Sequence, residues 1–573
     1  MQDYAPPLDD MRFVIEHVAR GDEIAAWPGL EHCTPDLREA VLGEAGRFAA
    51  GELAPLNASG DLDGAVLENG VVRTARGFRE AYRKFAEAGW VGLAAAETLG
   101  GQGLPSLWNT ATNELWAAAN VSFQLCPLLS QAVIDAIQHH GSAEQQRLYG
   151  EPLTSGRWTG AMCLTEPQAG SDVGALRTRA VPDGNRYRIH GTKVFITYGE
   201  HDLAENIVHL VLARIEGAPA GSKGLSLFIV PKFLPKEDGT PGRRNDLRCV
   251  SLEHKLGVKA SPTCVMAYGD DEGAIGWLIG APGDGMRCMF TVMNNARLAV
   301  GHQGLGVAER AFQQALTYAR ERVQGGRDGK PVPIIEHLDV RRMLLTMRAQ
   351  IAAMRALCYW TAAWMDRSER HPEPAERQRA ADRVALLTPM VKAWCTDLAV
   401  EIASMGIQVH GGMGFIEETG AAQHLRDARI LPIYEGTNGI QALDLVGRKL
   451  QLDGGELPWS LLNELRAEVA GVPDELAPPL HAALVTVERT TGWLQAAGPD
   501  DRAAGAAAYL RLFATTVGGV LLARGALAAE GSAGADWPAL ARFYLTALLP
   551  PALALETPAT AGAAMLDAAL PAG

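Results

Sequence analysis

One short segment of the chain places a single acidic side chain among glycines: Ile433-Tyr434-Glu435-Gly436-Thr437-Asn438-Gly439-Ile440-Gln441. A carboxylate in an apolar pocket becomes more basic, and it can take a proton from carbon if the pocket also admits a substrate. Gly436 and Gly439 leave the backbone uncovered, so a ligand can lie close to it. The same residues would also begin a helix, because Glu-Gly-Thr-Asn precedes an apolar run. The segment therefore fits either a proton-abstracting base or a helix N-terminus.

Several segments elsewhere in the chain combine glycines with hydroxyl and amide side chains. They are 163–174 (Cys-Leu-Thr-Glu-Pro-Gln-Ala-Gly-Ser-Asp-Val-Gly), 191–197 (Gly-Thr-Lys-Val-Phe-Ile-Thr), Arg297, 321–325 (Glu-Arg-Val-Gln-Gly) and 408–415 (Gln-Val-His-Gly-Gly-Met-Gly-Phe). Their order and separations, together with the Glu435 segment, are far more specific than any single motif. Over roughly residues 40 to 450, the chain resembles the acyl-CoA dehydrogenase flavoprotein family.

This resemblance implies the FAD-dependent oxidation of a saturated acyl-CoA thioester to the trans-2-enoyl-CoA. Glu435 would take the α-proton. Some relatives carry the base on a helix instead, but that position is Ala296 here, so Glu435 is the sole candidate base. The α-proton of a thioester is too weakly acidic for a carboxylate in water, so we expect a desolvated base and donors to the carbonyl oxygen. The implied substrate-binding residues are Ser171, Arg297, Glu435 and Gly436, although Arg297 fits a helix salt bridge equally well.

The resemblance also implies a set of FAD contacts. The segments that would cover the flavin contain Cys163, Leu164, Thr165, Phe195, Ile196 and Thr197. Gly170 and Ser171 would lie near the pyrophosphate, although an ordinary turn of a β protein is the alternative. Thr437 and Asn438 complete this part of the set. For His410, packing over the flavin edge is the more common outcome than catalysis.

A second group of residues matches positions that complete the FAD site of a neighbouring subunit: Arg322, Gln324, Gln408, Gly411 and Gly412. We therefore expect a homo-oligomer, most simply a homodimer, with an electron-transfer flavoprotein as electron acceptor. Three residues depart from the family pattern. Gly325 replaces a usual aromatic residue, Leu338 a usual polar residue, and Ala442 a frequent arginine. The last change alters the surroundings of the catalytic loop, so substrate preference cannot be transferred from better-known members.

Length, net charge and cysteine spacing limit the number of domains and the classes of partner that we expect. The chain has 573 residues and a net charge of −14, which predicts several domains and argues against nucleic acid or an anionic membrane as the main partner. The eight cysteines are scattered without metal-ligand spacing, so we expect reduced thiols, no metal site and a cytoplasmic location. No signal peptide pattern opens the sequence. The segment 506–529 is apolar, but arginines and a Gly-Gly pair interrupt it, which favours a buried helix, or two joined helices, over a membrane span.

The periodicity of apolar residues predicts a mainly α protein with a central β domain. We expect an N-terminal arm (1–40), an N-terminal helical domain (41–157), a middle β domain (158–282), a C-terminal helical bundle (283–452) and a helical C-terminal extension (459–573). Within the β domain, residues 235–244 have the composition of a solvated loop. The small-residue stripe Gly301, Gly304, Gly306 and Ala308 lacks a nucleotide-binding spacing and predicts close helix packing instead.

The arm and the C-terminal extension resemble a larger bacterial subgroup of the family. That subgroup includes 3-methylmercaptopropionyl-CoA dehydrogenases, which act in dimethylsulfoniopropionate breakdown. The resemblance implies this substrate or a similar short acyl-CoA, and the alternatives are a medium-chain fatty acyl-CoA dehydrogenase or an acyl-CoA oxidase. A nucleic-acid-binding flavoprotein is a further alternative, but from residue 459 onward the chain has six Arg, no Lys and eleven acidic residues. An acidic extension binds phosphate poorly.

Overall fold

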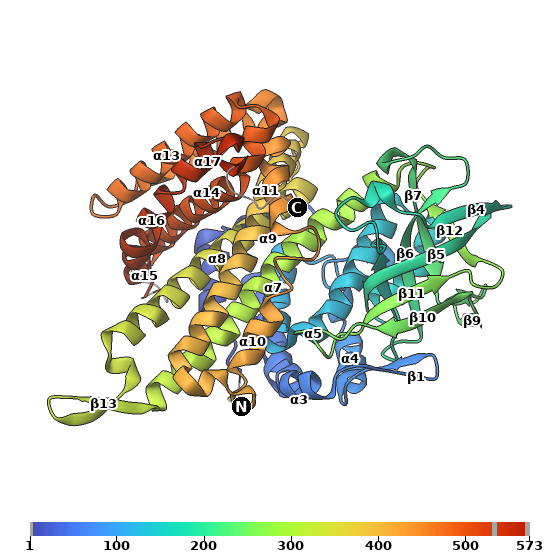
Figure 1. The fold of residues 1–573 in the computed structure, drawn as a ribbon, viewed down its shortest axis with the longest axis horizontal. Helices are drawn as coiled ribbons and strands as arrows, with labels where there is room; N and C mark the ends of the chain where they lie inside the picture. The colour runs from blue at the N-terminus through green and yellow to red at the C-terminus, as the bar shows by residue number, and fades with distance from the viewer. Residues whose placement is uncertain (1–3, 530–533, 535, 568–573) are drawn as a thin grey trace. The chain divides into compact units, whose positions relative to one another are not determined.

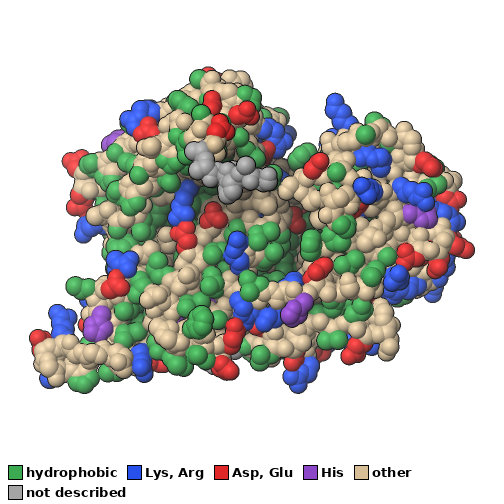
Figure 2. Space-filling view, viewed as in Figure 1, with side chains coloured by type: hydrophobic (Ala, Val, Ile, Leu, Met, Phe, Trp, Pro, Cys, Tyr) green, Lys and Arg blue, Asp and Glu red, His purple; other side chains and the backbone are tan. Residues whose placement is uncertain are grey.

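The computed structural model describes residues 4–529, 534 and 536–567, and packing divides the chain into two compact units. The β unit comprises Phe48–Leu104 and Ala119–Ala296. The helical unit comprises Met1–Arg47, Pro105–Ala118 and Arg297–Gly573. Acidic and basic side chains are interspersed over the face shown in Figure 2 rather than separated by sign.

An eight-stranded sheet forms the core of the β unit, with most strands in the order β10-β11-β5-β12-β7-β6-β3 and β4 paired with β5 and β6 (Figure 1). Strands β6 and β7 are buried almost throughout, which explains their continuous apolar runs in the sequence. The strands are β3 (Trp158–Cys163), β4 (Arg179–Asp183), β5 (Arg186–Thr197), β6 (Asn206–Ile215), β7 (Leu225–Pro231), β10 (Leu247–Leu252), β11 (Thr263–Tyr268) and β12 (Ala274–Ile279).

Helices and two small hairpins complete the β unit. The helices are α3 (Pro55–Asp63), α4 (Phe78–Glu87), α6 (Ala143–Thr154) and the later part of α5 (Ser106–His140). A reciprocal capping box between Ser142 and Gln145 begins α6. The hairpin of β1 (Val66–Glu68) and β2 (Val71–Arg73) lies within a region that we predicted to be helical. Its turn is Asn69-Gly70 with both residues at positive φ, which is the local signal that the helical periodicity obscured.

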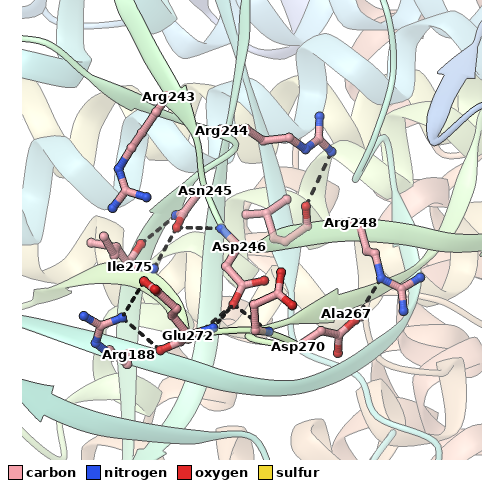
Figure 3. Close-up of a pocket in the computed structure, with 13 residues that line it drawn as sticks. Arg188, Arg243, Arg244, Asn245, Asp246, Arg248, Ala267, Asp270, Glu272 and Ile275 are labelled. Carbon is pink, nitrogen blue, oxygen red and sulfur yellow. Dashed lines mark hydrogen bonds and ion pairs between the residues drawn. The ribbon is translucent and has the colours of Figure 1, made fainter.

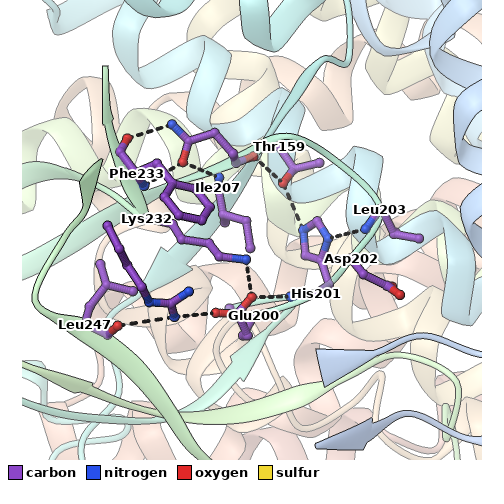
Figure 4. Close-up of polar contacts among 12 residues, drawn as sticks. Thr159, Glu200, His201, Asp202, Leu203, Ile207, Lys232, Phe233 and Leu247 are labelled. Atoms are coloured by element: carbon purple, nitrogen blue, oxygen red, sulfur yellow. Dashed lines mark hydrogen bonds and ion pairs between the residues drawn. The ribbon is translucent and has the colours of Figure 1, made fainter. Parts of the chain in front are cut away.

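The prediction of a loop at residues 235–244 is wrong, because strands β8 (Phe233–Pro235) and β9 (Pro241–Arg244) form a hairpin. Asp238 closes its turn by accepting hydrogen bonds from the N–H and the hydroxyl of Thr240. Two ion pairs also hold the hairpin in place: the buried Glu200 carboxylate contacts Lys232 and, at 3.0 Å, Arg244 (Figure 4). A short hairpin of this kind depends on its turn and on distant ion pairs, so it leaves no apolar alternation in the sequence.

Three long helices and two short ones form the bundle of the helical unit. The long helices are α7 (Gly285–Glu321, counted from Arg297), α8 (Leu338–Arg370) and α9 (Pro374–His410), and the short ones are α10 (Ala421–Ala428) and α11 (Asn438–Gly447). The prediction that the glycine stripe serves helix packing is confirmed. A Cβ at Gly301 would lie 2.5 Å from Val391 Cγ1, and one at Gly304 would lie 2.8 Å from the Cys395 carbonyl oxygen. These glycines allow α7 to approach α9 closely.

The C-terminal extension contains α12 (Leu457–Val469), α13 (Ala477–Ala496), α14 (Pro499–Ala528), α15 (Trp537–Phe543), α16 (Leu549–Leu553) and α17 (Glu556–Thr560). Helix α14 packs against α8, α9 and α11, so the extension covers the bundle (Figure 1). The N-terminal arm, with α1 (Leu8–Phe13), meets it where Arg524 donates to the Val18 carbonyl oxygen at 2.7 Å.

Among the residues that the structure describes, three helical segments are long and apolar enough to cross a membrane: Ser106–His140, Pro499–Ala528 and Trp537–Thr560. The prediction that 506–529 is a buried helix is confirmed, because 83% of the apolar window of α14 lies inside the protein. Only 28% of the window in Trp537–Thr560 is buried.

Candidate active site

Glu435 lies on the short loop between α10 and α11, in the helical unit. The interpretation of its segment as a helix N-terminus is confirmed, and the interpretation as a base stays a prediction. The segment does begin a helix, but the cap is Thr437, whose Oγ1 accepts from the Ile440 N–H at 3.2 Å. Glu435 itself has φ +55°, a left-handed conformation that non-glycine residues seldom adopt and that is common at functional sites.

Hydrogen bonds hold the loop on both sides of Glu435. The Tyr434 hydroxyl donates to Gln303 Oε1 on α7, and the Asn438 N–H donates to the Pro432 carbonyl oxygen at 2.9 Å. These contacts hold Glu435 in its unusual conformation before any ligand binds.

The side chain of Asn438 attaches the first residue of α11 to helix α9. Its Nδ2 lies 2.7 Å from Asp397 Oδ1, 2.9 Å from Thr396 Oγ1 and 3.0 Å from the Ala393 carbonyl oxygen, and its Oδ1 accepts from Lys392 Nζ at 2.8 Å. The predicted FAD contact at Asn438 is therefore restricted to backbone atoms, because internal partners use the whole amide. Sequence reasoning missed Lys392 and Asp397, since no local motif connects them to the loop.

The electrostatic setting of Glu435 suits a base. Burial raises the pKa of the Glu435 carboxyl, while the positive charges of Arg297 and Lys392 oppose that rise. The carboxylate is therefore more basic than in water but still has cations near it that favour its ionised form. The influence of Lys392 could not be read from the sequence, because this lysine lies on α9, far from Glu435 in the chain.

Two buried polar atoms near Gly436 lack partners among the described residues: Arg297 Nε and Gln441 Oε1. Arg297 is 5% exposed, and its Nη2 would lie 3.6 Å from a Cβ placed at Gly436. Within the part of the chain that the structure describes, Arg297 makes no ion pair, so the salt-bridge alternative is not observed. Buried polar atoms are rarely left unpaired, and these two are free to meet a polar ligand.

In the β unit, the structure brings together two segments that we predicted to cover a flavin. The Val194 N–H donates to the Thr165 carbonyl oxygen at 2.9 Å, and Lys193 Nζ donates to the Leu164 carbonyl oxygen at 2.9 Å. Lys193 Nζ also pairs with Glu166 Oε1 at 2.8 Å. Burial alone would raise the pKa of Glu166, but Lys193 and donors from 177 and 178 lower it to about 2. This buried ion pair was not predicted.

The side chains of the two predicted flavin-covering segments differ in their exposure to solvent. The Phe195 ring is 62% exposed and its backbone has φ +61°, so a flat apolar face points away from the core. Thr165 and Thr197 are partly exposed, whereas the side chains of Cys163 and Ile196 are buried in the core of the sheet. The Cys163 contact predicted for a cofactor is therefore restricted to its backbone.

The loop of Gly170 and Ser171 is exposed. Asp172 Oδ1 accepts from the Gly174 N–H at 3.0 Å, which closes the following turn. The geometry is that of an ordinary Gly/Ser turn and leaves the Ser171 hydroxyl accessible, so both interpretations of this loop stay open.

Arg322, Gln324, Gln408, Gly411 and Gly412 lie in the helical unit and are all exposed. Arg322 and Gln324 lie at the hairpin of β13 (Val323–Arg327) and β14 (Lys330–Pro333), and the others lie at the end of α9. His410 packs inside the helical unit, and its predicted place over the flavin edge stays a prediction. Its Nδ1 bonds the Gly406 carbonyl oxygen at 2.7 Å, its ring stacks on Tyr318 with centroids 4.5 Å apart, and burial lowers its pKa.

A cleft of about 690 Å³ in the β unit contains none of the predicted site residues (Figure 3). Its charges are largely paired with one another, as in the 2.8 Å contact between Arg248 and Asp270. The Asp246 carboxylate accepts from the N–H groups of 271, 272 and 273. The polar groups of this cleft therefore hold its own surface loop in place, and the cleft is not the candidate site. Among the described residues, no cluster of three His, Cys, Asp or Glu side chains could hold a metal ion.

Comparison with known proteins identifies the family. Family models match the chain in succession: acyl-CoA dehydrogenase N-terminal domain (35–157), middle domain (161–270) and C-terminal domain (283–450), then acetyl-CoA dehydrogenase C-terminal like (461–569). The chain is 52% identical over 457 residues to the 3-methylmercaptopropionyl-CoA dehydrogenase of Ruegeria pomeroyi, covering 79% of this chain and 77% of that protein.

More distant matches agree. The chain is 39% identical over 418 residues to a butyryl-CoA dehydrogenase of Syntrophomonas wolfei, covering 70% of this chain and 68% of that protein. The solved acyl-CoA dehydrogenase of Bacillus anthracis, complexed with FAD, has a TM-score of 0.74 at 22% identity and covers 95% of this chain and 90% of that one. The predicted family and fold class are thus confirmed: a central β domain between helical domains, with a helical extension, in a chain that belongs to the acyl-CoA dehydrogenase family.

Proposed function

We propose that this protein catalyses the α,β-dehydrogenation of a short acyl-CoA thioester, with 3-methylmercaptopropionyl-CoA as the foremost candidate, to the trans-2-enoyl-CoA. The observation that carries the proposal is Glu435: a carboxyl made more basic by burial, held at positive φ beside Gly436 and two unpaired polar atoms. The 52% identity to a 3-methylmercaptopropionyl-CoA dehydrogenase supports the substrate class.

The chain's own residues would act on the thioester as follows. Glu435 takes the α-proton, and the desolvated carboxylate does so more readily than a carboxylate in water. The backbone at the partly exposed Gly436 and the unpaired Nε of Arg297 are available donors for the charge that develops on the thioester carbonyl. Because the loop is already held by Tyr434 and Asn438, little reorganisation is needed when substrate binds.

The residues of the β unit fit FAD. The exposed face of Phe195 suits stacking on a flat ring, and Thr165 and Thr197 offer hydroxyl and backbone groups beside it. The chemistry that FAD supplies when bound is two-electron oxidation, in which the β-hydrogen of the thioester leaves as hydride. The role of the protein is to hold the ring and to place Glu435 for the α-proton.

Replacing Phe195 by Ala should weaken FAD binding by roughly 2- to 12-fold, because an aromatic stacking contact contributes about 0.5–1.5 kcal/mol. Titration of the FAD-free protein with FAD, followed by flavin fluorescence, measures this. Phe195→Trp should bind FAD as well as the parent does. Val250→Ala, which shortens another exposed apolar side chain of the β unit, serves as the control. Equal affinity in the Phe195→Ala protein would remove this residue from the flavin site.

An anaerobic titration with 3-methylmercaptopropionyl-, butyryl- and octanoyl-CoA tests the substrate. We expect bleaching of the flavin by all short thioesters and the highest rate constant with 3-methylmercaptopropionyl-CoA. Fastest bleaching by octanoyl-CoA would favour a medium-chain fatty acyl-CoA dehydrogenase. A flavin that none of the three reduces would contradict the proposed reaction. Rapid reoxidation of the reduced flavin by air would indicate an oxidase.

Three further features of the proposal concern assembly and surroundings. A homodimer is supported by exposed apolar side chains near the segments predicted to face a neighbouring subunit: Val323, Leu338, Met413, Phe415 and Ile416, of which Phe415 is 85% exposed. A cytoplasmic location is supported by eight free, buried cysteines. Family membership supports an electron-transfer flavoprotein as acceptor. Sedimentation equilibrium of the parent and of Phe415→Ser tests the dimer, since the variant should shift toward monomer.

A further inference from the structure

Helix α9 contains a fully buried lysine, Lys392, that contacts the end of the loop carrying Glu435. Lys392 is 0% exposed, and its Nζ donates to Asn438 Oδ1 at 2.8 Å. Among the described residues, no carboxylate lies within ion-pair distance of this ammonium. Lysine is almost never fully buried without a partner of opposite charge, because desolvation of the ammonium is costly. An arrangement of this kind therefore calls for a functional explanation.

The charged groups that face Lys392 come from three elements. Glu435 approaches from the loop before α11, Asp397 from one turn along α9, and Arg297 from α7. Burial lowers the pKa of Lys392 to about 7, Glu435 and Asp397 oppose that change, and Arg297 adds to it. The influence is mutual, because the positive charge of Lys392 lowers the pKa of Glu435. The two groups therefore interact through space without a direct hydrogen bond.

The hydrogen bonds of Lys392 also have a geometric consequence. Asn438 is the first residue of α11, and Glu435 lies three residues before it. Lys392, together with Thr396 and Asp397, fixes the orientation of the Asn438 amide and so the C-terminal end of the loop. Loss of the lysine would leave Asn438 Oδ1 with a single weak donor, Thr396 Oγ1 at 3.3 Å.

Building on the proposed function, we propose that Lys392 is a positioning residue for the Glu435 base. It holds the loop through Asn438, and its charge keeps Glu435 ionised and ready to accept a proton. Lys392 does not itself touch the substrate. Its effect on the reaction passes through Glu435, whose negative charge disappears when the α-proton is taken.

The sign of the pH effect follows from these charges. Without the ammonium, Glu435 holds its proton more tightly and loses its activity as a base at a higher pH. The difference from the parent should be largest below about pH 7, where Lys392 is charged, and should shrink above it, where the lysine becomes neutral. The part of the effect that comes from loop position should persist at all pH values.

The pH dependence of kcat/KM for the holoenzyme tests both parts. Lys392→Met should move the acidic limb upward by about one pH unit and lower kcat by about tenfold, with less change in KM. Lys392→Arg, which keeps the charge and a donor, should leave the limb near that of the parent. The matched control is Lys449→Met, because Lys449 is also buried but faces Asp444. The acidic limb of the pH profile of this variant should stay at the parental position.

A second measurement does not depend on activity. Thermal unfolding of the parent, Lys392→Met, Glu435→Gln and the double variant forms a mutant cycle. At about pH 6.5, where Lys392 is charged, the summed losses in Tm of the single variants should exceed the loss in the double variant by about 1–2 °C. The difference should diminish at about pH 8.5, where the lysine is neutral.

These outcomes separate the two proposals. If the parent oxidises acyl-CoA but Lys392→Met shows an unmoved acidic limb and additive changes in Tm, the role of Lys392 is overturned. If no thioester reduces the flavin of the parent, the proposed function fails, and the mutant cycle alone then reports whether Lys392 and Glu435 interact. A moved limb with non-additive Tm values supports the role of Lys392.

Discussion

Glu435→Gln should lower the rate of flavin bleaching by acyl-CoA by about 10²–10⁴-fold, because a positioned general base contributes that much and the alternative base position of the family is Ala296 here. Gln has the shape of Glu but cannot accept the α-proton. Anaerobic stopped-flow absorbance with the preferred thioester measures this rate. FAD binding should be unchanged, since the Glu435 side chain is not among the predicted FAD contacts and Gln keeps its shape.

The matched control is Glu456→Gln, an exposed carboxyl of the same unit, which should bleach at the parental rate. The parent should also show a pH dependence of defined sign. Burial raises the pKa of Glu435, and the base works only when ionised, so kcat/KM should fall as the pH drops through that raised value. Bleaching at the parental rate in Glu435→Gln would show that another group is the base.

Arg355→Met should destabilise the protein by about 3–5 kcal/mol, since it leaves buried carboxylates without their counter-ion. Arg355 is fully buried. It pairs with Glu114 at 2.6 Å and with Glu309 at 2.8 Å, and the Tyr359 hydroxyl donates to Glu114 at 2.6 Å. This network joins α5, α7 and α8 inside the helical unit. Unfolding in urea, or a fall in Tm, measures the loss.

The loss should depend on pH in a defined direction. Burial raises the pKa of Glu114 even with Arg355 present, and removal of the arginine should raise it further. A carboxyl with a raised folded-state pKa loses stability as the pH rises through that value, so the variant should suffer more at about pH 8 than at about pH 5.5. Glu114→Gln in the variant should restore part of the loss.

The control for Arg355 is Arg341→Met, which removes an exposed pair with Glu336 at 2.9 Å. Surface pairs contribute no more than about 1 kcal/mol, so its free energy of unfolding should barely change. A similarly small effect in Arg355→Met would mean that the buried carboxylates are already protonated and that the network stabilises the bundle little.

The comparison of sequence and structure is clearest at the catalytic loop. Glu435 and its glycines are neighbours in the sequence, so the segment predicted both a base and a helix start, and the structure contains the helix start at Thr437. The apolar periods of α7 and α9 likewise predicted helices, because a buried face repeats every turn of the same segment. The Asn-Gly hairpin at 69–70 was available as a local signal but was overlooked within a helical pattern.

What the sequence determined by itself was therefore local: the family, the helix start beside Glu435, the order of helical and β regions, and the close packing at Gly301 and Gly304. What only the tertiary structure decided was which distant polar groups meet. Lys392 reaches Asn438 across 46 positions, and Arg355 reaches Glu114 across 241. A helix or strand can be predicted from the period of its own apolar residues. A buried charge, in contrast, is paired with a group from a segment far away in the chain, and no local pattern in the sequence identifies that partner.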